Sequence, residues 1–241
     1  MADAGFAQQH ALLARGYGGA DDPPDPADVL AMPIVLHLPK QDPPRRSAVL
    51  EAAAAATVTL CLDERCGPDG AWHDALVAWT TARIRKVARR ARGAQWLAAQ
   101  EVAGVTVDID GAQARVLVPG RVGDLDPRIR RLQIGGTDLP HDDPGDPAPG
   151  LPVLWVNAAL EMTLGKAAAQ VGHAAMLLAG ALDVEQAWTW AEQGYRSAVR
   201  DAPAAQWPGL TLSARVAVRD AGFTEVAPGS TTVLAIPGVG G

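Results

Sequence analysis

The stretch from Leu151 to Gly180 constrains the fold more than any other part of the chain. It begins with a short apolar, β-prone run after Pro152. After a brief connection it continues as an alanine-rich helical pattern that Gly165 opens. Buried strands that lead into amphipathic helices are typical of α/β proteins. The chain is therefore expected to belong to the α/β class.

Three polar side chains share one face of the expected helix. Lys166, Gln170 and His173 are separated by four and three residues, which places them on a single helical stripe. The stripe starts just past the end of a strand, where ligand sites gather in open α/β sheets. Spacing alone equally fits an ordinary amphipathic helix whose lysine reaches solvent and whose histidine packs against a neighbour.

The composition indicates a globular protein of one large or two small domains. The chain has 241 residues, 48% of them hydrophobic, and a formal net charge of −6, which argues mildly against nucleic-acid binding. We expect neither a secretory signal nor a membrane span, and hence a cytoplasmic protein. Cys61 and Cys66 are expected to be reduced, because their spacing without further ligands is a poor zinc signal. No metal site is predicted.

A linker rich in proline and aspartate divides the chain into two α/β parts. We expect a turn-rich, loosely packed lead-in at 1–31, a first part at 32–139, the linker at 140–151 and a second part at 152–241. The strands are expected at 33–38, 105–109, 114–118, 132–134, 153–156, 196–199, 212–219 and 232–236. The helices are expected at 6–15, within the lead-in, and at 45–62, 71–101, 166–181 and 184–193.

Two motifs in the second part resemble a known family. The first is G-K-x-A-x-Q-x-x-H-A from Gly165, and the second is D-A-G-x-T-x-x-x-P-G-[ST]-x-T from Asp220. In this order they resemble the type 2 peptidyl-tRNA hydrolases, found mainly in archaea and eukaryotes, over residues 152–238. The resemblance implies a mixed four-stranded sheet flanked by helices, in a domain that usually forms homodimers.

The resemblance also implies an activity: hydrolysis of the ester that joins a peptide to the terminal ribose of tRNA, with no cofactor. Such a reaction needs a positioned water, a base, and donors for the oxyanion. The implied catalytic residues are Lys166, Gln170, Asp220 and Thr224. Asp220 would orient or deprotonate water or hold Lys166, and Lys166 would stabilise negative charge. The positions with an implied supporting role are His173, Gly165, Gly222, Ser230 and Thr232.

The chain also departs from the family pattern. Asn157 and Ala159 stand where the family usually has an arginine and an aspartate, and Leu164 stands where it commonly has a lysine. These changes weaken the expected tRNA-binding surface more than the catalytic centre. A non-catalytic binding or regulatory protein of the same fold therefore remains the alternative.

The two parts match each other weakly. The run at 33–38 parallels 152–157, and the run at 114–118 parallels 214–218. These matches predict an internal duplication, in which one chain holds the family's sheet twice as a fused pseudo-dimer. Two unrelated α/β segments would be the alternative. The first copy would be inactive, because Arg46, Leu50 and Gly120 would replace Lys166, Gln170 and Asp220.

Residues 83–92 form the most basic run of the chain. We expect a helix here whose cations contact the backbone of tRNA, the implied substrate. A solvated helix face is the alternative. The chain is expected to be a monomeric pseudo-dimer or a homodimer. The candidate nucleic-acid-binding residues are Arg83, Arg85, Lys86, Arg89, Arg90 and Arg92.

Overall fold

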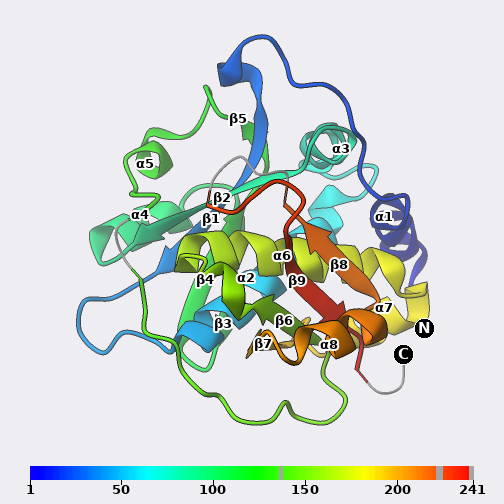
Figure 1. Ribbon diagram of the computed structural model, residues 1–241. Coiled ribbons are helices and arrows are strands. Elements are labelled where there is room, and N and C mark those ends of the chain that lie inside the picture. The colour runs from blue at the N-terminus through cyan, green and yellow to red at the C-terminus, as the bar shows by residue number, and fades with distance from the viewer. Residues whose placement is uncertain (136–137, 221–224, 239–241) are drawn as a thin grey trace.

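The computed structural model describes residues 1–135, 138–220 and 225–238, and it contains two mixed β-sheets with helices between and around them (Figure 1). Two alanine-rich helices, α2 (Arg46–Cys61) and α6 (Leu164–Ala181), pack against each other. Each of them contacts strands of both sheets. Small side chains allow this close packing, and the buried faces of α2, α6 and both sheets form one core.

The first sheet has the strand order β2-β1-β4-β3, and β5 pairs with β1. β1 runs parallel to β2 and antiparallel to β4, and β3 is antiparallel to β4. The strands are β1 (Leu30–His37), β2 (Arg85–Ala91), β3 (Gly104–Ile109), β4 (Ala112–Leu117) and β5 (Gly120–Arg121).

The second sheet repeats this plan, with the order β7-β6-β9-β8. β6 runs parallel to β7 and antiparallel to β9, and β8 is antiparallel to β9. The expected mixed sheet flanked by helices is therefore confirmed in a duplicated arrangement. The strands are β6 (Val153–Asn157), β7 (Ala198–Ala202), β8 (Val216–Arg219) and β9 (Thr231–Ile236).

Further helices cover the outside of the molecule (Figure 1). They are α1 (Ala4–Ala14), α3 (His73–Thr81), α4 (Ala94–Gln100), α5 (Pro127–Arg130), α7 (Val184–Glu192) and α8 (Trp207–Ser213), with short 3₁₀ turns at Pro26–Asp28, Glu64–Cys66 and Ala158–Leu160. None of the helices in the described ranges is long and apolar enough to cross a membrane.

The predicted long helix at 71–101 is wrong. The chain leaves α3 after Thr81, forms the edge strand β2 and re-enters a helix only at Ala94. β2 pairs in register with β1 from Ala31–Arg85 to His37–Ala91. This ladder, available only in the folded chain, overrides the helical propensity of the arginines and lysine.

The other corrections are smaller. The first half of the lead-in is packed rather than loose, because Phe6 and Leu13 of α1 are buried in the core, whereas residues 14–28 are mostly exposed. The expected strand at 132–134 is a single bridge between Gln133 and Arg90. The start of the expected strand at 212–219 is helical, as part of α8.

The alignment of 114–118 with 214–218 is also wrong. By its place in the strand order, β3 of the first sheet is equivalent to β8 of the second, and β4 is equivalent to β9. The counterpart of Asp220 is therefore the tight turn at Asp110, not Gly120. That turn joins β3 to β4 directly. In the second sheet the longer segment 220–230 takes its place and carries the second motif.

Candidate functional site

The first turn of α6 is fastened to the segment between β8 and β9. Thr163 caps the helix, and its hydroxyl oxygen accepts a hydrogen bond from the Lys166 backbone N–H at 3.3 Å. The carboxylate of Glu225 accepts bonds from the backbone N–H (3.0 Å) and the hydroxyl (2.8 Å) of Thr163. The middle of the second motif is thereby held against the start of the first.

Lys166 and Asp220 form an ion pair between α6 and the end of β8. Their side chains are only 11% and 9% exposed, so both charges are largely removed from water. The backbone of Asp220 is fixed on both sides, because its N–H donates to the Ser230 carbonyl (2.9 Å) and its carbonyl accepts from the Gly229 N–H (2.8 Å). A partly buried pair in fixed geometry differs from a mobile surface salt bridge.

Two buried side chains extend this ion pair into the sheet. The amide nitrogen of Gln170 donates to Asp220 Oδ2 at 2.9 Å, the same oxygen that Lys166 contacts. The hydroxyl of Thr232, on β9, donates to the amide oxygen of Gln170 at 2.6 Å. Thr232 is fully buried and Gln170 is 8% exposed. The bond from Thr232 fixes which end of the Gln170 amide faces the carboxylate.

His173 lies one turn further along α6, and its buried Nε2 does not join this chain of hydrogen bonds. Burial, and secondly the charge of Lys86, hold its pKa well below the usual range, so the imidazole is neutral at pH 7. Its Nε2 is buried and has no hydrogen-bond partner among the described residues, and the Tyr17 ring meets it edge-on with centroids 5.5 Å apart. A neutral imidazole cannot act as a cationic donor here.

Gly165 lies where the first sheet comes nearest to this helix start. A side-chain Cβ at Gly165 would lie 3.5 Å from the carbonyl oxygen of Ile134 and 3.6 Å from Cβ of Ala88. The edge strand β2 of the first sheet therefore borders the site of the second. The two remaining motif positions, Gly222 and Thr224, lie outside the described residues.

The six candidate nucleic-acid-binding residues are distributed over β2 and its ends, not over a helix. Arg83 and Arg85 pair with the carboxylate of Asp22. Lys86 points inward, with its nitrogen 4.7 Å from the centre of the Trp79 ring.

The remaining three arginines lie toward the end of β2. Arg89 donates to the carbonyl oxygens of Arg130 (3.2 Å) and Leu132 (2.9 Å). Arg90 bonds to the Gln133 side chain, and Arg92 is exposed.

Sequence reasoning missed the role of Arg46 and Asp138. Arg46 is buried at the start of α2, where its guanidinium donates to the Met162 carbonyl (3.1 Å) and to Asp138 Oδ1 (3.2 Å). The same carboxylate oxygen accepts the Leu164 N–H at 3.0 Å. These residues tie the starts of the two central helices together. No short-range spacing signals such contacts, because the partners are far apart in sequence.

Cys61 and Cys66 are free and buried, as expected for reduced cysteines. Cys66 Sγ donates to the Leu60 carbonyl at 3.1 Å. Among the described residues, no group of three or more histidine, cysteine or acidic side chains is arranged to hold a metal ion.

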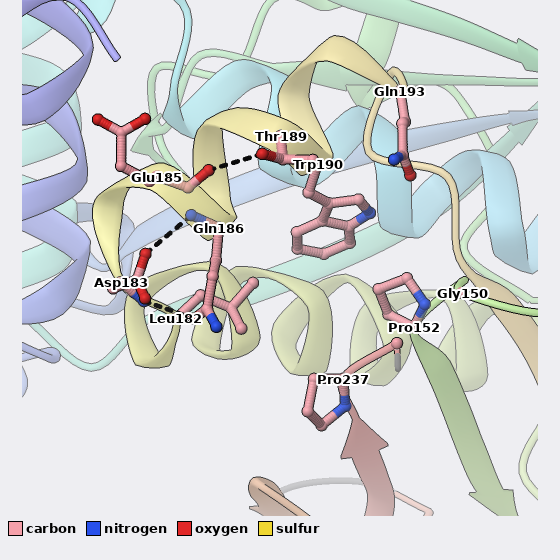
Figure 2. A pocket seen from close by; sticks show the side chains of 11 residues that line it. Gly150, Pro152, Leu182, Asp183, Glu185, Gln186, Thr189, Trp190, Gln193 and Pro237 are labelled. Carbon is pink, nitrogen blue, oxygen red and sulfur yellow. Dashed lines mark hydrogen bonds between the residues drawn. The ribbon is translucent and has the colours of Figure 1, made fainter. Parts of the chain in front are cut away.

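A cavity of about 360 Å³ lies at the other end of α6 (Figure 2). Between Lys166 and Leu182, which lines the cavity, the helix rises by about 24 Å. The polar groups there serve the cap of α7: Asp183 and Gln186 exchange hydrogen bonds in a capping box, and Thr189 bonds to the Glu185 carbonyl. The cavity is thus separate from the ion pair and offers no comparable chemistry.

Comparison with known proteins places the family likeness on the part of the chain that holds the ion pair. Residues 152–239 match the family model described as peptidyl-tRNA hydrolase PTH2. A stretch of 95 residues is 41% identical to a probable peptidyl-tRNA hydrolase 2 of Schizosaccharomyces pombe, covering 35% of this chain and 46% of that protein. The chain thus spans about half the length of this curated relative. No solved structure matches the chain. Residues 152–239 therefore carry the likeness to the type 2 peptidyl-tRNA hydrolases that the two motifs predicted.

Proposed function

We propose that the Lys166–Asp220 site hydrolyses the ester between a peptidyl or aminoacyl group and the 3′ ribose of tRNA. One observation carries this proposal. Lys166 and Gln170, from the first motif, and Asp220, from the second, meet at one carboxylate oxygen although the motifs are about fifty residues apart in sequence. The cluster lies largely out of water, where charged groups cost stability, so its presence favours a functional role over a structural one.

In this proposal each side chain has a role in ester hydrolysis. The Asp220 carboxylate accepts a proton from a water molecule that attacks the ester carbonyl. Lys166 supplies a positive charge beside the oxyanion that then develops. Gln170 holds the carboxylate in place, and Thr232 holds Gln170. The oxyanion then collapses, the C–O bond to the ribose breaks, and the ribose oxygen takes up the proton that Asp220 had accepted, which restores the carboxylate.

A binding protein of the same fold is the second candidate. Leu164, at a position where the family commonly has lysine, is 1% exposed and belongs to the core. Asn157, at another changed position, caps the turn at Ala158–Leu160 and donates to the Thr231 carbonyl. These family positions have structural roles here and offer no charged group to tRNA, which favours the binding protein.

The test is turnover of peptidyl-tRNA by the full chain and by Lys166→Ala and Asp220→Asn variants. Both variants should lose at least a hundredfold in kcat/KM, the usual contribution of a general base or a charge-stabilising group. Lys40→Ala, at an exposed position, is the control and should keep full turnover.

Folding of each variant is checked by its thermal midpoint. If the parent protein shows no turnover where an authentic family member works, the hydrolase proposal fails and the binding protein replaces it.

A further inference from the structure

The edge strands β2 and β7 occupy equivalent places in the two sheets. Each runs parallel to a central strand, with Ala88 opposite Ile34 in the first sheet and Val199 opposite Leu154 in the second. Ile34 and Leu154 are both fully buried and face the helical core. Each edge strand also contacts the central helix of the other sheet, since β2 contacts α6 and β7 contacts α2.

At equivalent positions the two edge strands differ in charge. Two residues beyond Ala88, β2 carries Arg90, and two residues beyond Val199, β7 carries Asp201. Ala88 lies against Gly165, next to Lys166. Arg90 is therefore about 7 Å further along the strand from the site. At this position the edge beside the Lys166–Asp220 pair carries a cation and its counterpart carries an anion, and the arginine of β7, Arg200, is paired with Glu51.

More arginines surround the end of β2. The backbone N–H of Arg90 donates to the Gln133 carbonyl at 2.9 Å, which joins β2 to the segment that follows α5. Arg130 and Arg131 are exposed at the end of α5. The segment then reaches Gly165 through Ile134. No carboxylate of the described residues lies within 4 Å of the guanidinium groups of this arginine cluster, which comprises Arg90, Arg92, Arg130 and Arg131.

The equivalent place beside α2 is covered by acidic residues of the linker. Asp142 accepts hydrogen bonds from the backbone N–H (2.9 Å) and the hydroxyl (2.5 Å) of Ser47, in the first turn of α2. Asp201 lies 2.5 Å from Nδ1 of His141. A chain of phosphates would be repelled here and attracted to the arginine cluster, because the two edges differ in the sign of their charge.

We propose that the arginine cluster, which belongs to the first sheet and its flanking segments, binds phosphate groups of tRNA and so presents the ester to the Lys166–Asp220 pair of the second sheet. The assignment of tRNA rests on the proposed function. The first α/β part then supplies substrate affinity to a site whose own part of the chain has lost basic residues. Arginines gathered around the end of β2 suit a phosphodiester backbone, which they contact without reading sequence. The Arg130 guanidinium also donates to the Leu125 carbonyl at 3.0 Å, which leaves Arg92 and Arg131 as the cluster's most available cations.

The test compares the tRNA affinity of the full chain with that of two double variants over a series of salt concentrations. Arg92→Glu with Arg131→Glu changes the arginine cluster. Arg15→Glu with Arg215→Glu makes the same change of net charge at exposed positions near the opposite end of α6. Labelled deacylated tRNA is the probe, and fluorescence anisotropy gives the dissociation constant.

The cluster variant should bind at least tenfold more weakly at low salt. The slope of log affinity against log salt concentration should be smaller in magnitude by about 1.4 to 1.8, because two phosphate contacts are lost. The control should stay within twofold of the parent. Equal weakening in both variants, no weakening in either, or no tRNA binding by the parent would overturn the proposal.

Turnover separates this inference from the proposed function. If the parent hydrolyses peptidyl-tRNA but the cluster variant keeps its tRNA affinity, the hydrolase stands and the arginine cluster does not bind substrate. If tRNA binding depends on the cluster but the parent shows no turnover, the phosphate-binding surface stands and the hydrolase fails.

Discussion

The hydroxyl of Thr232 donates to the amide oxygen of Gln170 at 2.6 Å, in a place where the threonine has no exposed surface. Through this contact β9 determines the orientation of an amide on α6, and the amide in turn holds the carboxylate of Asp220. The geometry of the charged pair therefore depends on a neutral residue that never meets solvent.

Thr232→Val should weaken both the fold and the turnover of the ester. Valine keeps the shape but leaves the Gln170 amide oxygen buried without this donor, which costs about 1–3 kcal/mol of unfolding free energy. We expect turnover to fall about tenfold, because the amide is no longer held. Urea unfolding and peptidyl-tRNA kinetics measure the two effects. Thr232→Ser, which keeps the hydroxyl, is the matched control, and similar losses in both variants would contradict the role of the hydrogen bond.

Gly172→Ala should destabilise the packing of α6 on α2. A Cβ at Gly172 would lie 2.6 Å from Oγ1 of Thr57, whose hydroxyl is bonded to the Ala53 carbonyl at 2.8 Å. We expect a loss of about 1–3 kcal/mol, although the same change in an open helix gains about 1 kcal/mol.

The double variant Gly172→Ala with Thr57→Ala provides the control. It should recover most of the stability lost by Gly172→Ala alone. Additive effects in chemical denaturation would show that the two residues do not meet.

Lys86→Met should stabilise the protein at neutral pH and lose this advantage in alkali. Burial lowers the pKa of Lys86 to about 8, against about 10.4 in an unfolded chain. Below pH 8 the lysine is charged in both the folded and the unfolded chain, and burying its charge lowers the free energy of unfolding. Methionine carries no charge and avoids this cost. We expect a gain of about 1–3 kcal/mol at pH 7.

Between about pH 8 and pH 10 the unfolded parent binds more protons at this residue than the folded parent does. The stability of the parent therefore rises with pH toward that of the variant. Denaturation curves of both proteins from pH 6 to pH 10 measure the difference, and a gap that is constant over this range would contradict the shifted pKa.

The two cysteines should resist alkylation in the native protein. Burial raises the pKa of both thiols to about 12, which leaves about a thousandth of the ordinary thiolate at pH 8. Labelling with iodoacetamide should therefore be at least a hundredfold slower than in the urea-unfolded chain. Mass spectrometry follows both residues separately. Fast labelling of Cys66 with slow labelling of Cys61 would show that the 3₁₀ turn at Glu64–Cys66 opens on its own.

Much of the second α/β part could be predicted from sequence. Residues on one helix, such as Lys166 and Gln170, have a fixed geometric relation, so their spacing placed them together. The contact of both with Asp220 followed from the family motifs and not from any local rule. Thr163 and Glu225 were missed, because the contact between a helix cap and a distant loop leaves no periodic trace.

The first part was predicted less well for a physical reason. The arginines and lysine of 83–92 favour a helix locally, but the ladder with β1 and the contact with α6 make this segment a strand. The likeness of 114–118 to 214–218 also misaligned the two parts and matched Gly120 to Asp220. Sheet pairing is a long-range property, and a short sequence window does not contain it.

The repeated strand order has a consequence for how such a chain changes over time. In a dimer of identical subunits, every substitution appears twice, so an arginine beside one reaction centre also appears beside the other. Here different residues of one chain form the two sheets, so a substitution changes only one of them. One edge could therefore become Arg90 and the other Asp201 without conflict, which frees each unit to specialise.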